Sequence, residues 1–226
     1  MKQIEIKKDI LSAHEMIARE NRELFKEKGI FVLNLMSSPG AGKTTLLERT
    51  IELLKNTFNL GVIEGDIATS YDAERISAHG VKVVQINTGG ACHLESSMIK
   101  NTMAEFNTER LDVLIIENVG NLVCPAEFDL GEDIKIMILS VTEGEDKPLK
   151  YPLMFRLSKA LIINKIDLLP YIDCSIDRMV RDAKSINSDL RIFEISCTKK
   201  MGLNAWKDWL QEEISKKNLA SLKQLE

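Results

Sequence analysis

The chain has 226 residues, 44% hydrophobic and 28% charged, which is typical of one globular domain or a small pair. Its 30 Lys and Arg against 34 Asp and Glu leave a formal net charge of -4, so it lacks the basic excess of a sequence-independent nucleic-acid binder. An aromatic content of only 5% also argues against a stacking surface for single strands.

The apolar stretches of the chain are short. None approaches the ~20 residues that a membrane-spanning helix requires, and the first ten residues lack the apolar core of a signal peptide. We therefore expect a cytoplasmic protein that binds no nucleic acid and no membrane, with its four cysteines reduced.

Short apolar runs alternate with helical patterns along the chain. Residues 9–28 have apolar side chains at helical spacing and Gly29 is typical of a helix end, which predicts a leading amphipathic helix. Helices on both faces of a parallel sheet bury its strands, so an α/β fold with three layers is expected. The predicted strands are residues 30–36, 62–64, 81–86, 113–116, 134–141, 161–163 and 192–195.

A phosphate-binding loop follows the first predicted strand. Residues 37–45 read Ser-Ser-Pro-Gly-Ala-Gly-Lys-Thr-Thr and lead into a helical pattern over 46–55. In such a loop the backbone N–H groups turn toward phosphate oxygens, Lys43 reaches the terminal phosphates and the Thr44 hydroxyl is suited to Mg²⁺. The pattern departs from Gly-x-x-x-x-Gly-Lys-Ser/Thr at Ser37. The predicted nucleotide-binding residues here are Gly40, Ala41, Gly42, Lys43, Thr44 and Thr45.

The choice of base is indicated by Asn-Lys-Ile-Asp at residues 164–167, directly after a predicted strand. The Asp167 carboxylate can accept from both N1–H and the 2-amino group of guanine, whereas adenine offers no such donor pair. GTP is therefore favoured over ATP, with Asn164 and Lys165 in the same site. Ser196 and Cys197, after the last strand, are expected to contact the base through their backbone.

Acidic residues end two further strands. Asp66 and Glu117 stand where the carboxyl ends of parallel strands open onto a ligand crevice, and each can hold Mg²⁺. Asp72 is a candidate for orienting the attacking water beside Lys43, with helix capping as its alternative role. Gly120 would let the backbone approach the γ-phosphate. No arginine finger is evident near these strings, so slow hydrolysis is expected.

Cys92 and His93 lie in one loop and Cys124 in another, and both loops should leave the same sheet edge. Two thiolates and an imidazole suit Zn²⁺ or Ni²⁺, although isolated cysteines are often only buried small side chains. Three ligands leave such a site incomplete, and a twofold dimer could complete it. The other cysteines and histidines are predicted outside this site, the histidines on helix surfaces: Cys174, Cys197, His14 and His79.

Together these strings resemble the HypB family, GTPases that assist nickel insertion into nickel-iron hydrogenase. The resemblance rests on the phosphate loop, Glu-Gly-Asp at 64–66, Thr-Gly-Gly-Ala-Cys-His-Leu at 88–94, Glu-Asn-Val-Gly-Asn-Leu-Val-Cys-Pro at 117–125, and residues 164–167. It implies a homodimer that hydrolyses GTP to GDP and phosphate with Mg²⁺ and binds Ni²⁺ or Zn²⁺ at the matching Cys92, His93 and Cys124.

The implied partners are hydrogenase maturation proteins and the hydrogenase large subunit. Some family members carry a Cys-rich or His-rich N-terminal stretch, and residues 1–10 contain neither residue type, so a second nickel site there is not expected. The sequence pattern divides the chain into an N-terminal helix at 1–29, a P-loop GTPase domain at 30–215 and a polar tail at 216–226 that is expected to fray.

Three alternatives use the same strings differently. UreG-like urease accessory GTPases share the guanine motif, but their metal string resembles Cys-Pro-His on one loop. A small-molecule kinase would want an acceptor pocket and usually lacks the guanine motif. A zinc-stabilised dimerisation module with vestigial turnover would not need Lys43, Thr44, Asp66 and Glu117 together.

Overall fold

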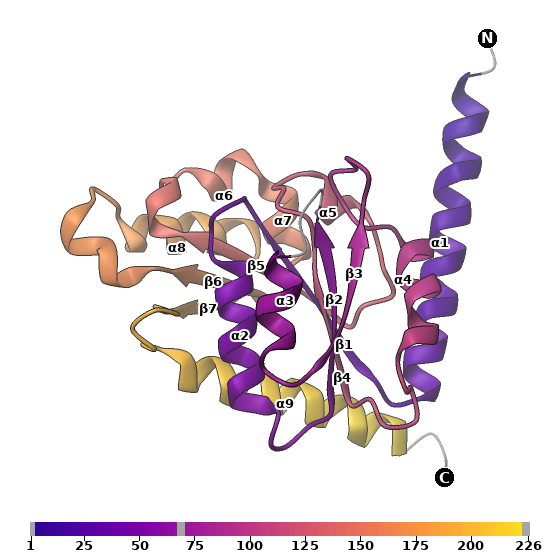
Figure 1. Cartoon of the computed structure of the whole chain (residues 1–226). Coiled ribbons are helices and arrows are strands. Elements are labelled where there is room, and N and C mark those ends of the chain that lie inside the picture. Colours follow the sequence, from indigo (N-terminus) through magenta and orange to yellow (C-terminus); the bar gives the residue numbers. More distant parts are fainter. Residues whose placement is uncertain (1–2, 67–70, 223–226) are drawn as a thin grey trace.

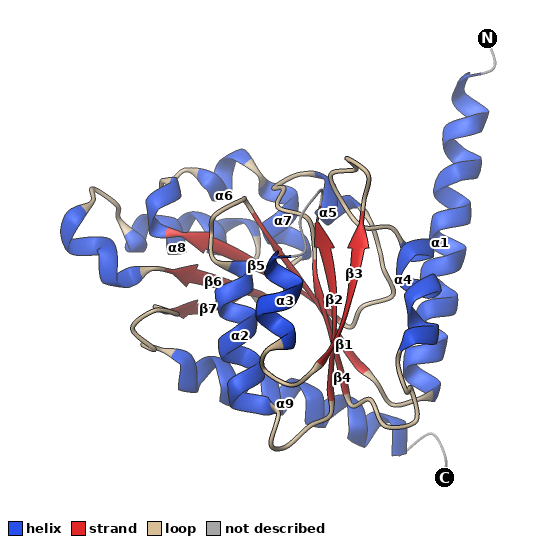
Figure 2. Cartoon of the chain, in the orientation of Figure 1, coloured by secondary structure: helices blue, strands red, loops and turns tan. Residues whose placement is uncertain are grey.

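One parallel sheet organises the molecule. The structure is a computed structural model that describes residues 3–66 and 71–222. In this part of the chain seven strands pair in the order β3-β2-β4-β1-β5-β6-β7, all neighbours parallel, which confirms the predicted fold class (Figure 2). The strands are β1 (Phe31–Ser37), β2 (Leu60–Asp66), β3 (Lys82–Asn87), β4 (Val113–Glu117), β5 (Ile134–Ser140), β6 (Ala160–Asn164) and β7 (Arg191–Glu194).

Helices cover both faces of the sheet (Figure 1). Helices α2, α3 and α9 pack on one face, and α1, α4, α7 and α8 on the other. The α-helices are α1 (Gln3–Glu27), α2 (Lys43–Leu54), α3 (Tyr71–Ser77), α4 (Ser96–Thr102), α5 (Cys124–Glu127), α6 (Lys147–Lys150), α7 (Pro152–Leu157), α8 (Ile176–Ile186) and α9 (Leu203–Leu222). Short 3₁₀ segments are η1 (Met103–Glu105), η2 (Val141–Glu143) and η3 (Ile166–Tyr171).

The central strand β1 explains why its sequence is continuously apolar. All seven of its residues are buried, because successive side chains point to opposite faces and both faces are covered. Phe31 and Leu33 join the core under α2 and α9, whereas Val32 joins the core under α1 and α4. The carboxyl ends of β1, β2, β4 and β6 therefore meet at one edge, where their loops converge.

The two terminal helices hold the sheet from outside. Gly29 has φ +67°, a left-handed conformation that ends α1 as its sequence predicts. Helix α9 runs to Leu222, which differs from the frayed tail predicted at 216–226. Lys217 donates to the carbonyl oxygen of Ile30 (2.5 Å) and to the carboxylate of Asp133 (2.7 Å), which ties this part of α9 to the sheet. Residues 223–226 lie outside the described residues.

No helix among those described combines the length and the apolar character needed to cross a bilayer.

Trp206 anchors α9 in the core. Its side chain is fully buried, its indole N–H donates to Thr50 Oγ1 (3.0 Å), and its ring lies 5.6 Å from that of Phe193. We expect Trp206→Ala to lower the free energy of unfolding by about 3–5 kcal/mol, since it leaves a large cavity and removes the hydrogen bond to Thr50. Urea unfolding followed by circular dichroism measures this. Tyr171→Ala, at a side chain 82% exposed, should change stability by no more than about 0.5 kcal/mol. Equal losses in both variants would contradict the anchoring role.

Candidate functional site

The phosphate loop connects β1, which ends at Ser37, to α2, which begins at Lys43. Gly40 (φ +78°) and Gly42 (φ +98°) adopt left-handed conformations that require glycine, and a Cβ on Gly42 would lie 2.5 Å from Asn164 Nδ2. Ser37 needs no such freedom because it is still part of β1. Its buried hydroxyl accepts a hydrogen bond from Lys43 Nζ (3.3 Å), so serine fits the first position of the pattern.

A cavity of about 490 Å³ opens above this loop at the carboxyl edge of the sheet. Most residues predicted for the nucleotide line it: Gly40, Gly42, Lys43, Thr44, Thr45, Asp66, Asp72, Glu117, Gly120 and Lys165. It is also lined by polar side chains that were not predicted from the sequence: Glu64, Arg75 and Asn118. Ala41 is buried beneath it.

Buried carboxylates form the floor of the cavity. Thr44 Oγ1 donates to Glu117 Oε1 (2.8 Å), while Oε2 of Glu117 and Oε2 of Glu64 are buried without a hydrogen-bond partner among the described residues. Burial, then the charges of Glu117 and Asp66, raise the pKa of Glu64 to about 8, and burial raises the pKa of Glu117 to about 7. Carboxylate oxygens that await a partner beside a hydroxyl fit Mg²⁺. Glu64 could have been predicted from the sequence, because it lies two residues before Asp66 and therefore on the same face of the strand.

Helix α3 adds a cation to the cavity. Arg75 Nη2 lies 2.8 Å from Glu48 Oε2 and its Nη1 lies 3.1 Å from Asp72 Oδ1. Asp72 is therefore paired with Arg75 inside the first turn of α3. The sequence predicted no arginine finger, and the structure places Arg75 in the lining of the cavity, paired with two carboxylates. The signal for Arg75 was its spacing of three residues from Asp72, which puts both side chains on one helix face.

Asn164 ties three loops together at the base end of the site. Its Nδ2 donates to the carbonyl of Ala41 (3.0 Å), and its Oδ1 accepts from the backbone N–H of Lys165 (2.8 Å) and of Cys197 (3.2 Å). Lys165 has φ +63° and donates from Nζ to the Gly40 carbonyl (2.6 Å). The guanine motif is thus bonded directly to the phosphate loop.

Asp167, Ser196 and Cys197 lie beyond the residues that line the phosphate cavity. Oδ1 of Asp167 is buried and has no hydrogen-bond partner among the described residues. Ser196 Oγ accepts from the Lys199 N–H (3.1 Å), and burial raises the pKa of Cys197 to about 11, so this thiol stays neutral. The last two side chains are therefore turned into the loop, and backbone groups are what it can offer a ligand.

Cys92, His93 and Cys124 come together at the same edge. One donor atom from each lies within 4.8 Å of the others, and all three residues are half-buried. Cys92 Sγ lies 2.9 Å from Cys124 Sγ and 3.6 Å from His93 Nδ1. The hydrogen bond shared with Cys92, then burial, raise the pKa of the Cys124 thiol. Two soft donors and an imidazole at this spacing fit Ni²⁺ or Zn²⁺.

The other histidines and cysteines lie elsewhere among the described residues. Cys174 is half-buried outside the metal cluster. His14 and His79, predicted on helix surfaces, each keep only 22% of their side-chain exposure. His14 is covered because the ring of Phe128 packs edge-on against it, with centroids 5.9 Å apart.

Residues 31–194 match the family described as CobW/HypB/UreG, nucleotide-binding domain. The hydrogenase maturation factor HypB of Azotobacter vinelandii is 49% identical over 210 residues, which cover 93% of this chain and 69% of that protein. The chain belongs to the HypB family. This confirms the resemblance found in the sequence and favours HypB over the urease accessory alternative.

Two solved HypB structures share the fold closely. HypB from Helicobacter pylori in complex with nickel superimposes with a TM-score of 0.85 at 41% identity, covering 90% of this chain and 96% of that one. HypB from Archaeoglobus fulgidus gives a TM-score of 0.85 at 38% identity, covering 90% and 99%.

The buried Glu64 should make stability depend on pH. Its pKa is raised from 4.5 to about 8, so its contribution is fully present below the unfolded pKa and is lost as pH rises through the folded one. In Mg²⁺-free buffer we expect the free energy of unfolding to fall between about pH 5 and pH 9, and Glu64→Gln to flatten that fall. Urea unfolding at several pH values tests this, with Glu23→Gln, at an exposed residue of α1, as the control. An unchanged slope in Glu64→Gln would contradict the assignment.

Proposed function

We propose that this chain is a Mg²⁺-dependent GTPase that carries nickel for hydrogenase maturation, with its metal site coupled to the nucleotide state. One observation carries the proposal. The loop from Glu117 to Cys124 begins in the phosphate cavity and ends at the cysteine cluster. Two HypB findings support it: relatives named hydrogenase maturation factors, and a HypB structure that contains nickel.

Asp167 Oδ1 is buried without a hydrogen-bond partner among the described residues, which supports guanine as the base, since the N1–H and 2-amino groups of guanine can donate to this carboxylate. At the other end, Lys43 and the loop N–H groups hold the phosphates. Arg75 supplies a further positive charge from across the cavity, and Asp72 orients the attacking water. Because Arg75 is held by two carboxylates, hydrolysis is expected to be slow until it is released.

Thr44, Asp66 and Glu117 would hold Mg²⁺, which offsets the charge of the β- and γ-phosphates when bound. The Glu117 oxygen without a partner supports this assignment. Glu64 is a further buried carboxyl group in the lining of the same cavity. It carries no charge while it is protonated.

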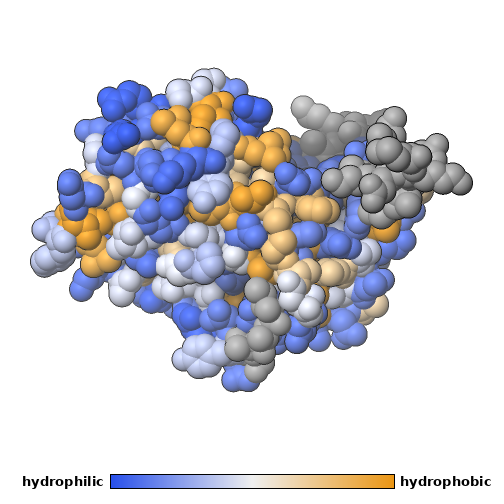
Figure 3. Space-filling view, turned by 90° about the horizontal axis from the view of Figure 1, so that it is seen from above, coloured by the Kyte–Doolittle hydropathy of each residue, from blue (hydrophilic) through white to orange (hydrophobic). Residues whose placement is uncertain are grey.

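Cys92, His93 and Cys124 are the proposed cargo site for nickel, with zinc as the other metal that they suit. Three donors leave coordination positions open, and a twofold dimer would supply a second set. Exposed apolar side chains support self-association, among them Val123 beside Cys124 (50% exposed) and Leu149 (57%). In the view from above, toward which β2 and β3 point, hydrophobic residues form several groups (Figure 3).

The two sites are proposed to share one equilibrium. A Cβ on Gly120 would lie 3.2 Å from Pro39, so the loop that ends at Cys124 packs directly on the phosphate loop. A γ-phosphate there would reposition the loop and change the geometry at the thiolates. Linkage then requires that metal change nucleotide affinity by the same factor. Release of metal after hydrolysis would pass it to hydrogenase maturation proteins and the hydrogenase large subunit in the cytoplasm.

The base choice can be tested by nucleotide turnover. Asp167→Asn should weaken GTP binding roughly 10- to 100-fold, because charge-assisted hydrogen bonds to guanine are lost. Lys43→Ala should abolish turnover while the fold remains. Equilibrium titration with GTP measures the loss of binding, and phosphate release from GTP and ATP, with and without Mg²⁺, measures turnover. Equal turnover of ATP and GTP by the wild type would contradict the assignment of guanine as the preferred base.

Nickel affinity should depend on the cysteines and on the nucleotide. We expect Cys92→Ala, Cys124→Ala together to abolish tight Ni²⁺ binding, because both thiolates are lost. In the wild type, a GTP analogue and GDP should give affinities that differ about five- to 150-fold. Equilibrium titrations in each state, with the mass measured in parallel, record affinity and dimerisation together.

Cys174→Ala is the matched control for these titrations, since its thiol is half-buried outside the cluster. Its Ni²⁺ affinity should equal that of the wild type. Identical affinities and identical monomer fractions in GDP and the GTP analogue would refute the coupling and leave a GTPase that merely carries metal.

A further inference from the structure

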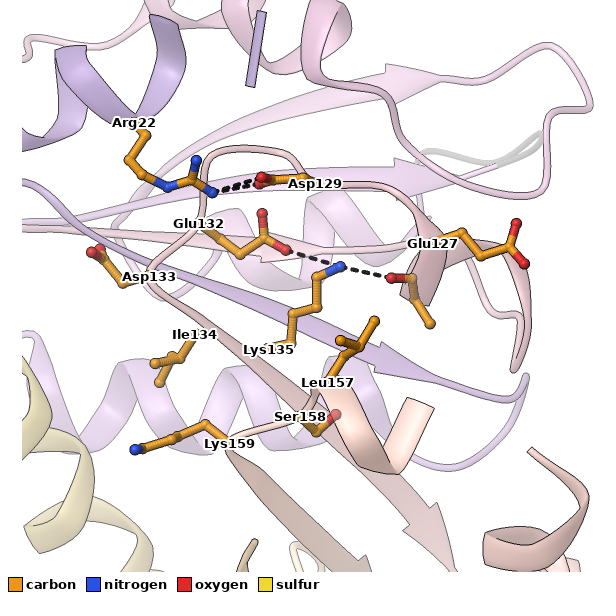
Figure 4. Close-up of a pocket in the computed structure, with 11 residues that line it drawn as sticks. Arg22, Glu127, Asp129, Glu132, Asp133, Ile134, Lys135, Leu157, Ser158 and Lys159 are labelled. Atoms are coloured by element: carbon orange, nitrogen blue, oxygen red, sulfur yellow. Dashed lines mark hydrogen bonds and ion pairs between the residues drawn. The ribbon is translucent and has the colours of Figure 1, made fainter. Parts of the chain in front are cut away.

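Helix α1 contacts both segments that follow the cysteine loops. On the α4 side, Ser96 Oγ donates to the carbonyl of His14 (3.0 Å), and Asn21 Nδ2 donates to the carbonyl of Ser96 (2.9 Å). On the side that follows Cys124, Arg22 pairs with Asp129 at 2.7 Å, as Figure 4 shows. Helix α1 therefore connects the segment that follows Cys92 and His93 with the segment that follows Cys124.

The imidazole of His93 has close contacts on two sides and a carboxylate near the third. Its Nδ1 lies 3.6 Å from Cys92 Sγ, and its ring stacks on Phe128 with centroids 3.7 Å apart. Its Nε2 is buried and has no hydrogen-bond partner among the described residues. The carboxylate within reach is that of Glu95, whose Oε1 lies 3.9 Å away.

Glu95 stands between two imidazoles. Its other oxygen, Oε2, lies 3.9 Å from His14 Nε2 on α1. Glu95 is the residue before α4 begins, yet its side chain makes no capping hydrogen bond to that helix. The carboxylate is thus directed at His14 and His93 and does not serve the helix end beside it.

We propose that Glu95 is a positioning residue for His93 and that, by sharing this carboxylate, His14 ties α1 to the metal cluster. A neutral imidazole that coordinates through Nδ1 carries its proton on Nε2, and metal-bound histidines usually donate that second N–H to a carboxylate or carbonyl. A small shift of Glu95 from its present 3.9 Å would let its carboxylate accept this bond, and Phe128 holds the ring plane, which keeps Nδ1 facing the two thiols. The inference rests on the proposed cargo site.

The role differs from simple attachment of α1, because other contacts already provide that. Lys100 on α4 pairs with Glu20 on α1 at 2.7 Å, and neither residue belongs to the cysteine cluster. Removing Glu20 therefore loosens the same two helices without touching His93. This makes Glu20 a matched control for Glu95.

Ni²⁺ titration of Glu95→Ala, Glu95→Gln and Glu20→Ala tests the positioning role. Glu95→Ala should lower Ni²⁺ affinity roughly 10- to 100-fold, the usual effect of losing such a partner. Glu95→Gln should lose less, because its amide oxygen still accepts from Nε2–H. Glu20→Ala should match the wild type. Equal affinity in Glu95→Ala and the wild type overturns the proposal, as does equal loss in Glu95→Ala and Glu20→Ala.

The nickel–thiolate absorption band and the melting temperature separate positioning from misfolding. If Glu95→Ala does not fold, Glu95→Gln carries the test, and wild-type affinity together with an unaltered band in that variant overturns the proposal. If the double cysteine variant still binds Ni²⁺ tightly, the cargo site itself is wrong. Loss of binding in the cysteine variants with no effect at Glu95 refutes only the positioning role.

The tie to α1 has its own readout. Ni²⁺ should slow backbone amide exchange over residues 13–27 in the wild type, and this protection should be lost in His14→Ala. Exchange that does not respond to Ni²⁺ in the wild type, or that responds equally in His14→Ala, overturns the tie.

Discussion

Asn118 follows Glu117 at the end of β4, and its buried amide holds two loops at once. Its Oδ1 accepts from the N–H of Leu94 (3.1 Å), the residue after His93, and its Nδ2 donates to Asn34 Oδ1 (3.2 Å). Replacing it would leave several buried polar groups unpaired, each at a cost of about 1–3 kcal/mol. The hydrogen bonds of the Asn118 amide therefore hold the loop after β3, which carries Cys92 and His93, in its present position beside the loop after β4.

The series of buried hydrogen bonds continues from Asn118 through Asn34. Asn34 Nδ2 donates to Glu132 Oε1 (3.2 Å), and Glu132 Oε2 accepts from the Leu130 N–H (2.7 Å). Asn21 of α1 donates to the carbonyl of that same Leu130 (3.0 Å). Asn21 Oδ1 is buried without a partner among the described residues, whereas the other amide and carboxylate groups of this network are paired, and such a network opposes partial rearrangement. Changes at the nucleotide edge should therefore move these elements together.

The fold was predictable because its strands are buried on both faces, which leaves apolar runs such as residues 30–36 with little other interpretation. The phosphate loop, the guanine motif and the metal trio were also visible, since each combines unusual residue types at short spacing. What escaped prediction depends on contacts distant in sequence. His14 looks like a surface residue of α1 until Phe128, more than one hundred positions later, packs on it. Arg75 becomes relevant only because α3 faces the phosphate loop.

Ser37 shows which part of the phosphate-loop pattern is a matter of backbone geometry. Left-handed φ angles occur at Gly40 and Gly42, whereas Ser37 is an ordinary strand residue. A pattern that demands glycine at the first position would therefore overlook chains built in this way. A search that instead required a buried strand, two left-handed glycines and the following lysine would retrieve them. In such loops the backbone conformation does not require glycine at the first position of the usual signature.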